Sequence, residues 1–295
     1  MLNEGVQMVN DLYDNIKENN LLYIGLFVVI LLCILTIYFL YTMIGEYLFL
    51  KVNVTVSETT VPVLCNKFSS FDAKFPDIGN GRRKSFSFWI YISDISKNYS
   101  YYKTVAAVSD NNKKDESIYR TASPHIFLDK NNNSMYCHFY DKSFNTEILN
   151  FGDINESKID DYMRTGIKIK YVPLQRWVHI AFVVNSDSFT TSIYAYVDGD
   201  LVNIEKHGNF DSEKTKKKDF NTIDLTQTKY LLVGGDSTNI KNSPGFSGLI
   251  SNFSCYNYEL NQNDINNIYN KGPVNGLLAY LGLGMYGVRY PIYKL

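Results

Sequence analysis

The chain of 295 residues carries 29 lysines and arginines against 30 aspartates and glutamates, so its formal net charge is -1. That balance excludes the strongly basic surface by which proteins bind nucleic acids, and we expect no nucleic-acid partner. Aromatic residues make up 15% of the chain and charged residues only 20%, which excludes a disordered protein, while four cysteines are too few for a disulfide scaffold.

Residues 1–20 predict a short amphipathic helix, because apolar residues from Val6 to Ile16 recur at steps of three and four. Four acidic residues and one lysine make this segment negative, which disfavours contact with anionic lipid headgroups. A flexible, disordered tail is the alternative interpretation of these residues.

Residues 21–45 contain no charged side chain and predict one transmembrane helix. A bilayer core requires about 20 apolar residues in helical conformation, because every backbone polar group must be paired within the segment. The predicted span includes Leu21, Phe27, Leu31, Leu35, Phe39 and Gly45. A cleaved signal peptide is the alternative, but its apolar core is only about 7–15 residues long and is followed by a small-residue cleavage site.

The sequence leaves open which side of the membrane the large domain occupies. Lys51, Lys67 and Lys74 follow the span and favour the cytoplasmic side by the positive-inside rule. Sequons for N-glycosylation favour the opposite side and occur at Asn53, Asn98, Asn132, Asn155 and Asn252.

After residue 51 the hydrophobic period changes to two, as in half-buried strands. Residues 85–92 place Phe86 and Phe88 on one face, with Trp89 and Tyr91 on the other. The other predicted strands are 51–56, 61–64, 104–108, 125–128, 135–140, 176–184, 192–197, 201–204, 230–233 and 248–258. Many short strands without intervening helices predict a mainly β chain with an antiparallel sandwich over residues 51–271.

Two local signals punctuate this pattern. Asp198-Gly199 between apolar runs predicts a tight hairpin, because glycine tolerates a positive φ. A Ca²⁺ site involving Asp198 and Asp200 is the alternative reading, and no other cofactor is indicated. Asn261 or Asn263 is expected to cap a closing helix that stops at Gly272-Pro273.

Five segments, in this order, resemble the concanavalin A-like, laminin-G-like jelly-roll superfamily. They are residues 86–92, 176–183, 196–202, 232–251 and 256–269. The resemblance covers residues 86–271 and implies a lectin-like jelly roll. This chain departs from the family pattern at Ser251, where the family usually has aspartate, and at Asp264, where it usually has glutamate.

The superfamily includes lectins, adhesion modules, glycosidases and structural domains, so the fold leaves the function open. Glycosidases need two carboxylates beside the scissile bond, and the laminarinase-like members carry them as E-x-D-x-E on one strand. This chain has no such triplet. The acids of residues 153–161 are interpreted as a solvated loop, so we expect a protein that is not an enzyme.

Candidate ligand-binding residues are Tyr101 and Tyr102, as an aromatic platform, and Asp236, as a polar group. Ordinary loop packing is the alternative for all three. A lysine-rich run at 214–218 is interpreted as a solvated loop because acidic residues flank it.

Residues 272–295 form an apolar, glycine-rich tail that lies outside the family resemblance. Its predicted interface residues are Leu277, Leu281, Met285 and Tyr286. A large apolar patch left exposed usually marks an interface. We expect the tail to pack on its own sandwich, to lie at the membrane surface or to contact a neighbouring protein.

These features predict a single-pass membrane protein that presents a non-catalytic, lectin-like jelly roll. The asparagine-rich composition, the span and the sandwich together resemble membrane or minor capsid proteins of large DNA viruses. That resemblance implies a virion protein that links an internal membrane to a capsid shell. The alternatives are a membrane-tethered, glycan-binding lectin and a glycoside hydrolase.

Overall fold

The computed structural model describes residues 20, 23–41, 53–56, 62–77, 82–112, 121–141, 156–187, 190–210, 217–235 and 244–273. The chain divides into two compact units, Met1–Leu50 and Lys51–Leu295. In the first unit a helix runs over Tyr23–Tyr41 with a mean hydropathy of 2.8, long and apolar enough to cross a bilayer. A signal sequence would satisfy the same criteria. Leu21 and Gly45, the predicted ends of the span, lie outside the described residues.

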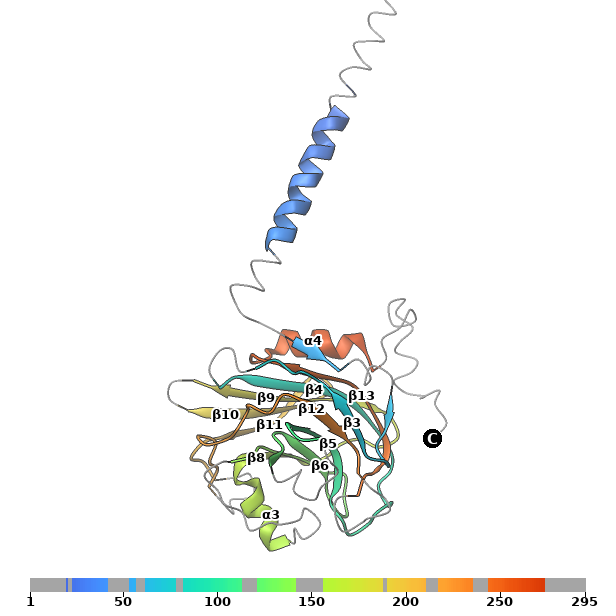
Figure 1. Ribbon diagram of the computed structural model, residues 1–295, viewed down its shortest axis with the longest axis vertical. Helices are drawn as coiled ribbons and strands as arrows, with labels where there is room; N and C mark the ends of the chain where they lie inside the picture. The colour runs from blue at the N-terminus through green and yellow to red at the C-terminus, as the bar shows by residue number, and fades with distance from the viewer. Residues whose placement is uncertain are drawn as a thin grey trace, which may run out of the picture. The chain divides into compact units, whose positions relative to one another are not determined.

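The second unit contains two antiparallel sheets packed face to face (Figure 1). Sheet A has the order β1 (Asn53–Thr55), β13 (Ser247–Tyr256), β4 (Lys84–Asp94), β9 (Trp177–Ser186), β10 (Thr191–Val197) and β11 (Asp200–Lys206), and β2 (Val63–Leu64) also pairs with β13. Sheet B has the order β3 (Ser69–Asp72), β12 (Tyr230–Val233), β5 (Lys103–Ser109), β6 (His125–Leu128), β7 (Met135–His138) and β8 (Gly166–Ile169). The predicted sandwich is confirmed, with β3 and β8 as strands that the hydrophobic period did not reveal.

The main core lies between the two sheets and follows from the period-two pattern. Phe86, Phe88 and Ile90 of β4 point inward and are fully buried. The ring of Phe88 stacks on that of Phe253 from β13, with centroids 5.6 Å apart. Trp89 belongs to a separate cluster on the outer face of sheet A. The alternation predicted for this strand is therefore confirmed.

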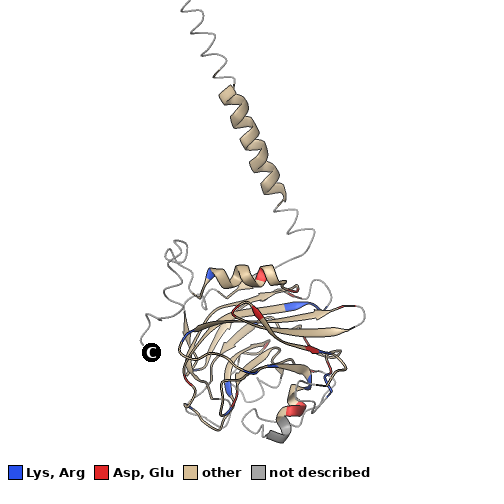
Figure 2. Cartoon of the chain, turned by 180° about the vertical axis from the view of Figure 1, so that it is seen from behind, with Lys and Arg blue, Asp and Glu red and all other residues tan. Residues whose placement is uncertain are grey.

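Helix α4 (Gln262–Lys271) covers the outer face of sheet A. Asn261 begins the helix in a capping box, because its side chain accepts from the amide of Asp264 and the Asp264 carboxylate accepts from the amide of Asn261. The ring of Tyr269 stacks on Trp89 at a centroid distance of 5.6 Å. The helix has an acidic residue in its first turn and a basic residue in its last turn (Figure 2). It ends at Lys271, and the cap and stop predicted from the sequence are confirmed.

Helix α3 (Glu156–Tyr162) and the short 3₁₀ helix η3 (Met163–Thr165) cover the outer face of sheet B (Figure 1). Residues 153–161 are thus not simply a solvated loop, because a helix begins within them at Glu156. Tyr162 and Met163 are buried in one cluster with Phe127 of β6. Most residues of this segment are polar or acidic, so its few apolar positions, which pack on the sheet, gave no clear helical pattern in the sequence.

The hairpin predicted at residues 198–199 connects β10 and β11. Asp198 and Gly199 have φ values of 52° and 91°, the positive angles that a tight primed turn requires. The Asp198 carboxylate accepts from the His179 amide at 2.9 Å and forms an ion pair with Arg176 at 2.5 Å. Asp198 therefore has partners that account for its place in the turn without a bound cation.

Candidate ligand-binding rim

Three loops meet at one end of the sandwich, residues 95–102, 129–134 and 170–176, and together they are called the rim. Strand register places them side by side. Lys103 of β5 is paired with Leu128 of β6, Leu128 with Met135 of β7, and Met135 with Ile169 of β8. Each rim loop begins or ends at one of these paired residues, so the loops are neighbours although they are distant in sequence.

The rim gathers exposed aromatic side chains. Tyr99 is 60% exposed, Tyr101 36% and Tyr171 63%. Among the described residues of the second unit, Phe210 is the other exposed large aromatic residue, and it follows β11 at the opposite end. Exposed tyrosines offer a flat apolar ring and a polar hydroxyl to a ligand at little entropic cost.

The loop 129–134 is held firmly between the two tyrosine-bearing loops. Buried Lys103 donates through Nζ to the carbonyls of Asp129 and Lys130 at 3.0 and 2.8 Å. On the other side, the side chain of Asn133 donates to the carbonyl of Val172 at 2.7 Å. The backbone amide of Val172 donates in turn to the backbone carbonyl of Asn133 at 2.9 Å. Desolvation lowers the pKa of Lys103 to about 8, against the attraction of the Asp129 and Asp94 carboxylates.

Polar groups stand beside the tyrosines. The Lys130 Nζ lies 4.8 Å from the ring centroid of Tyr102, a cation–π distance. Asn131 and Asn132 are exposed at the tip of the same loop. The Asp129 carboxylate accepts from the Tyr136 hydroxyl at 2.7 Å. Lys130, Asn131 and Asn132 therefore place ammonium and amide groups on the loop between the two tyrosine-bearing loops, which suits a polyhydroxylated ligand.

The structure treats the three predicted ligand residues differently. Tyr101 is exposed on the rim. Tyr102 is buried and makes edge contacts with Phe127 and Tyr136, so its ring is not available as a platform and that part of the expectation is corrected. Asp236 lies outside the described residues. The Asn98 side chain of the rim donates to the Gly245 carbonyl at 2.7 Å.

Tyr171 is a rim residue that the sequence did not identify as a ligand-binding candidate. It stands alone in a loop, without the neighbouring tyrosines that drew attention to residues 99–102. The only local signal was an aromatic residue between Lys170 and the Val172-Pro173 pair. Its relevance arises from the pairing of β7 with β8, which brings its loop beside the β6–β7 loop.

Acidic side chains, which a glycosidase needs, are rare on the described strands of sheet B, where β3 carries Asp72. Strands β12, β5, β6, β7 and β8 contain no aspartate or glutamate. Their outer face carries Phe127, Tyr136, His125 and His138, and residues of α3 and η3 pack against it. A pair of carboxylates on adjacent positions of these five strands, as a glycosidase of this architecture would use, is therefore missing from them.

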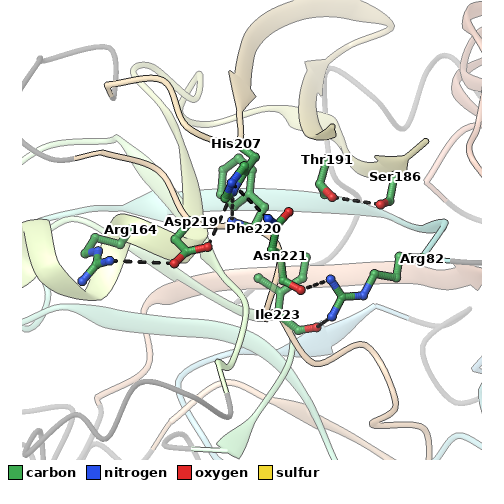
Figure 3. A network of polar contacts seen from close by, with 9 residues as sticks. All are labelled: Arg82, Arg164, Ser186, Thr191, His207, Asp219, Phe220, Asn221 and Ile223. Atoms are coloured by element: carbon green, nitrogen blue, oxygen red, sulfur yellow. Dashed lines mark hydrogen bonds and ion pairs between the residues drawn. The ribbon is translucent and has the colours of Figure 1, made fainter. Parts of the chain in front are cut away.

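A second polar cluster surrounds His207 (Figure 3). Its Nδ1 atom accepts from the Phe220 amide at 3.1 Å and lies 3.5 Å from the Asp219 carboxylate. Asp219 also lies 3.9 Å from the guanidinium of Arg164. Because His207 contacts the Phe220 amide, the Asn221 side chain and the Asp219 carboxylate, we interpret this cluster as a clasp that ties residues 217–223 to η3 and β11.

The position of Lys218 differs from the solvated loop that was expected for residues 214–218. It was assigned to a solvated loop, but its side chain is buried and its Nζ donates to the carbonyls of Met163 and Gly166, each at 2.9 Å. The lysine therefore holds η3 in place. No group of three or more histidine, cysteine or acidic side chains that could hold a metal ion occurs among the described residues.

The interface residues predicted in the tail lie outside the described residues, which end at Pro273. Pro273 itself is fixed to sheet A, because the Ser251 hydroxyl donates to its carbonyl at 2.6 Å. The side chain of Asn252, at a bulge of β13, donates to the Gly272 carbonyl at 3.1 Å. The start of the tail is thus anchored on β13.

Comparison with curated proteins finds no match. Among solved structures, the chain is similar to the botulinum neurotoxin serotype D binding domain, with 14% identity and a TM-score of 0.43. It is also similar to the botulinum neurotoxin type G receptor binding domain, with 13% identity and a TM-score of 0.42. The matches cover 70% and 74% of this chain but 41% and 46% of those chains, so the chain spans less than half of their length.

Likeness at this level says nothing about a ligand. The family model of the concanavalin A-like lectin/glucanases superfamily, in contrast, matches residues 72–266, which is more than half of the chain. This span includes both sheets from β4 to β13 and all three loops of the rim. The chain therefore belongs to the concanavalin A-like lectin/glucanases superfamily, as the order of its motifs predicted.

Proposed function

We propose that the protein is a membrane-anchored, non-catalytic binding protein whose rim recognises a carbohydrate. The observation that carries the proposal is the gathering of Tyr99, Tyr101 and Tyr171 at one end of the sandwich. The apolar face of a sugar ring packs well on a tyrosine ring, while its hydroxyls need amide and ammonium partners. Asn131 and Lys130 supply such groups between the tyrosine loops.

The non-catalytic part of the proposal rests on the absence of carboxylates from five described strands of sheet B. Glycoside hydrolysis needs an acid and a nucleophile or base on opposite sides of the scissile bond. Here α3 and η3 occupy the face on which a strand-borne pair would act. A binding role requires no such pair and agrees better with the exposed tyrosines.

The anchor is the helix Tyr23–Tyr41. We place the protein in a membrane as a single-pass protein, with the lipid bilayer as its first partner. Every described side chain of this helix is exposed in the isolated chain, as expected of a segment whose solvent is lipid. Recovery of the full-length chain in the carbonate-resistant membrane fraction supports the anchor, and release of a shortened chain into solution identifies a signal peptide instead.

An array of neutral and sialylated oligosaccharides, probed with the full chain in detergent, tests the binding role. The informative variant is Tyr171→Ala, and its matched control is Phe210→Ala, because both side chains are 63% exposed. We expect binding that falls at least about tenfold in the first variant, the loss of one stacking contact, and persists in the second. Failure of the wild-type chain to bind any glycan, or equal losses in both variants, contradicts the proposal.

The exposed apolar side chains of β11 favour a second, structural function. Strand β11 leaves Leu201, Val202 and Ile204 more than 40% exposed, and β11 is the longest edge strand among the described residues. The Asn203 side chain of β11 donates to the Lys168 carbonyl of β8 at 2.9 Å, so the exposed apolar side chains of β11, and not its backbone edge, suit contact with a protein partner. In a virus particle this contact, together with the tail 272–295, would link an internal membrane to a capsid shell.

The structural function is tested by cross-linking the chain in native membranes or particles and by mass spectrometry of the linked peptides. We expect peptides of β11 or of the tail to be joined to a capsid protein. The variant Ile204→Lys should abolish the β11 cross-links while leaving glycan binding intact. Cross-links confined to lipid-facing or rim peptides would eliminate the structural function.

A further inference from the structure

Two histidines face each other on the outer side of sheet B. His125 of β6 and His138 of β7 are directly paired in the antiparallel register. Side chains at paired positions share one face, with their Cβ atoms about 5 Å apart. Both are buried, with exposed fractions of 0% and 6%.

Tyr162, the last residue of α3, covers both rings. Its hydroxyl lies 3.0 Å from Nδ1 of His125, whose Nε2 lies 3.3 Å from the Thr104 hydroxyl. The Tyr162 ring stacks on the His138 ring with a centroid distance of 3.6 Å and an angle of 13°. Nδ1 of His138 is buried without a hydrogen-bond partner in the described part of the chain. Tyr162 therefore shields much of both imidazoles from water.

Little in the surroundings favours a charged imidazole. The titratable or charged residues on the elements that pack here are Glu156, Lys158, Asp160, Asp161 and Tyr162 on α3, Arg164 on η3, Lys103 on β5, Lys168 on β8, and Lys218 beside η3. Burial, followed by the proximity of His138, lowers the pKa of His125 well below 6.5, and burial lowers that of His138 to about 3.

We propose that this histidine pair is an acid-sensitive latch, and that protonation releases α3 from sheet B and exposes an aromatic surface. The released surface is formed by Phe127, Tyr136 and Tyr102, which α3 and η3 help to cover. Helix α3 has seven residues and little intrinsic stability, so lifting it costs less than opening the sandwich core.

The 3₁₀ helix η3, which follows α3 in the chain, stays attached to the sandwich. Lys218 donates to the carbonyls on both sides of η3, those of Met163 and Gly166. The Asp219 amide donates to the Arg164 carbonyl at 2.9 Å, and the Asp219 and Arg164 side chains approach to 3.9 Å (Figure 3). Helix α3 with Tyr162 therefore swings away while η3 remains attached as the hinge.

The sign of the pH dependence follows from linkage. The closed state keeps both histidines neutral, whereas an open state binds protons at an ordinary pKa of about 6.5. Closure is fully favoured above that pH and weakens below it by about tenfold per pH unit for each histidine. At pH 5 each histidine shifts the opening equilibrium by about 30-fold, and both together by about 1,000-fold.

Hydrogen–deuterium exchange of the full chain in detergent, from pH 7.4 to 5.0, tests the latch. After correction for intrinsic rates, we expect residues 156–162 to lose protection in acid while α4 keeps its own, with a parallel rise in binding of the dye ANS. The variant His138→Phe preserves the stacking on Tyr162 without a titratable ring, and combined with His125→Asn it should abolish the response.

His179 provides the matched control. It is also fully buried, and desolvation lowers its pKa to about 4, but it lies beneath α4 on the opposite sheet. His179→Asn should leave the acid release of α3 unchanged. Release of α3 at the same pH in the double variant overturns the proposal. If the double variant does not fold, the hydrogen–deuterium exchange of the wild-type chain in acid tests the proposal. Equal loss of protection in α3 and α4 would mean global unfolding and would contradict the latch.

Discussion

Trp177→Ala is the sharpest test of the packing on the outer face of sheet A. Trp177 is 1% exposed and belongs to a cluster with Trp89 and Leu249. Its ring lies 5.8 Å from that of Tyr91, its register partner on β4, and Tyr269 of α4 packs against the same cluster. Truncation leaves a cavity between sheet A and α4, and changes of this size cost about 3–5 kcal/mol.

For a unit of this size, each kcal/mol shifts the melting temperature by about 2–4 °C, so we expect a decrease of about 6–20 °C. Near-UV circular dichroism of the full chain in detergent measures it, since the aromatic signal reports tertiary packing. Tyr171→Ala is the control, because Tyr171 is 63% exposed and its loss should change stability by no more than about 0.5 kcal/mol. Equal melting temperatures for the two variants would refute the buried position of Trp177.

Other local features give independent expectations. Gly199→Ala should destabilise the unit by about 1 kcal/mol, because the position has a φ of 91° and an added Cβ would lie 3.1 Å from Asn266 Oδ1; chemical denaturation measures this change. Asn261→Ala should cost about 0.5–2 kcal/mol by removing the α4 capping box, whereas Asn261→Asp should be nearly neutral. Cys65, Cys137 and Cys255 are buried, and burial raises the pKa of each thiol, so at pH 8 they should react with a thiol reagent only after unfolding; rapid labelling of all three in the native chain would contradict this core.

The parts of this protein that depend on local pattern could be predicted from the sequence. Residues 85–92 alternate because one face of β4 meets the core and the other meets α4, so the period of two survives in both environments. The hairpin at residues 198–199 and the Asn261 cap were predictable because their chemistry acts within four residues. The fold class followed from such signals taken together.

The candidate site and the latch depend on long-range contacts, which no local pattern encodes. Tyr171 joins Tyr99 and Tyr101 only because β7 pairs with β8 and the loop 129–134 bridges the two sides. Tyr102, identical in type and adjacent to Tyr101, is buried because its ring points toward Phe127. His125 and His138 are 13 positions apart in sequence, and only the register of β6 against β7 places them face to face beneath Tyr162. Composition and period determined the strands, whereas strand order and register decided which side chains meet, because those depend on how the whole core packs.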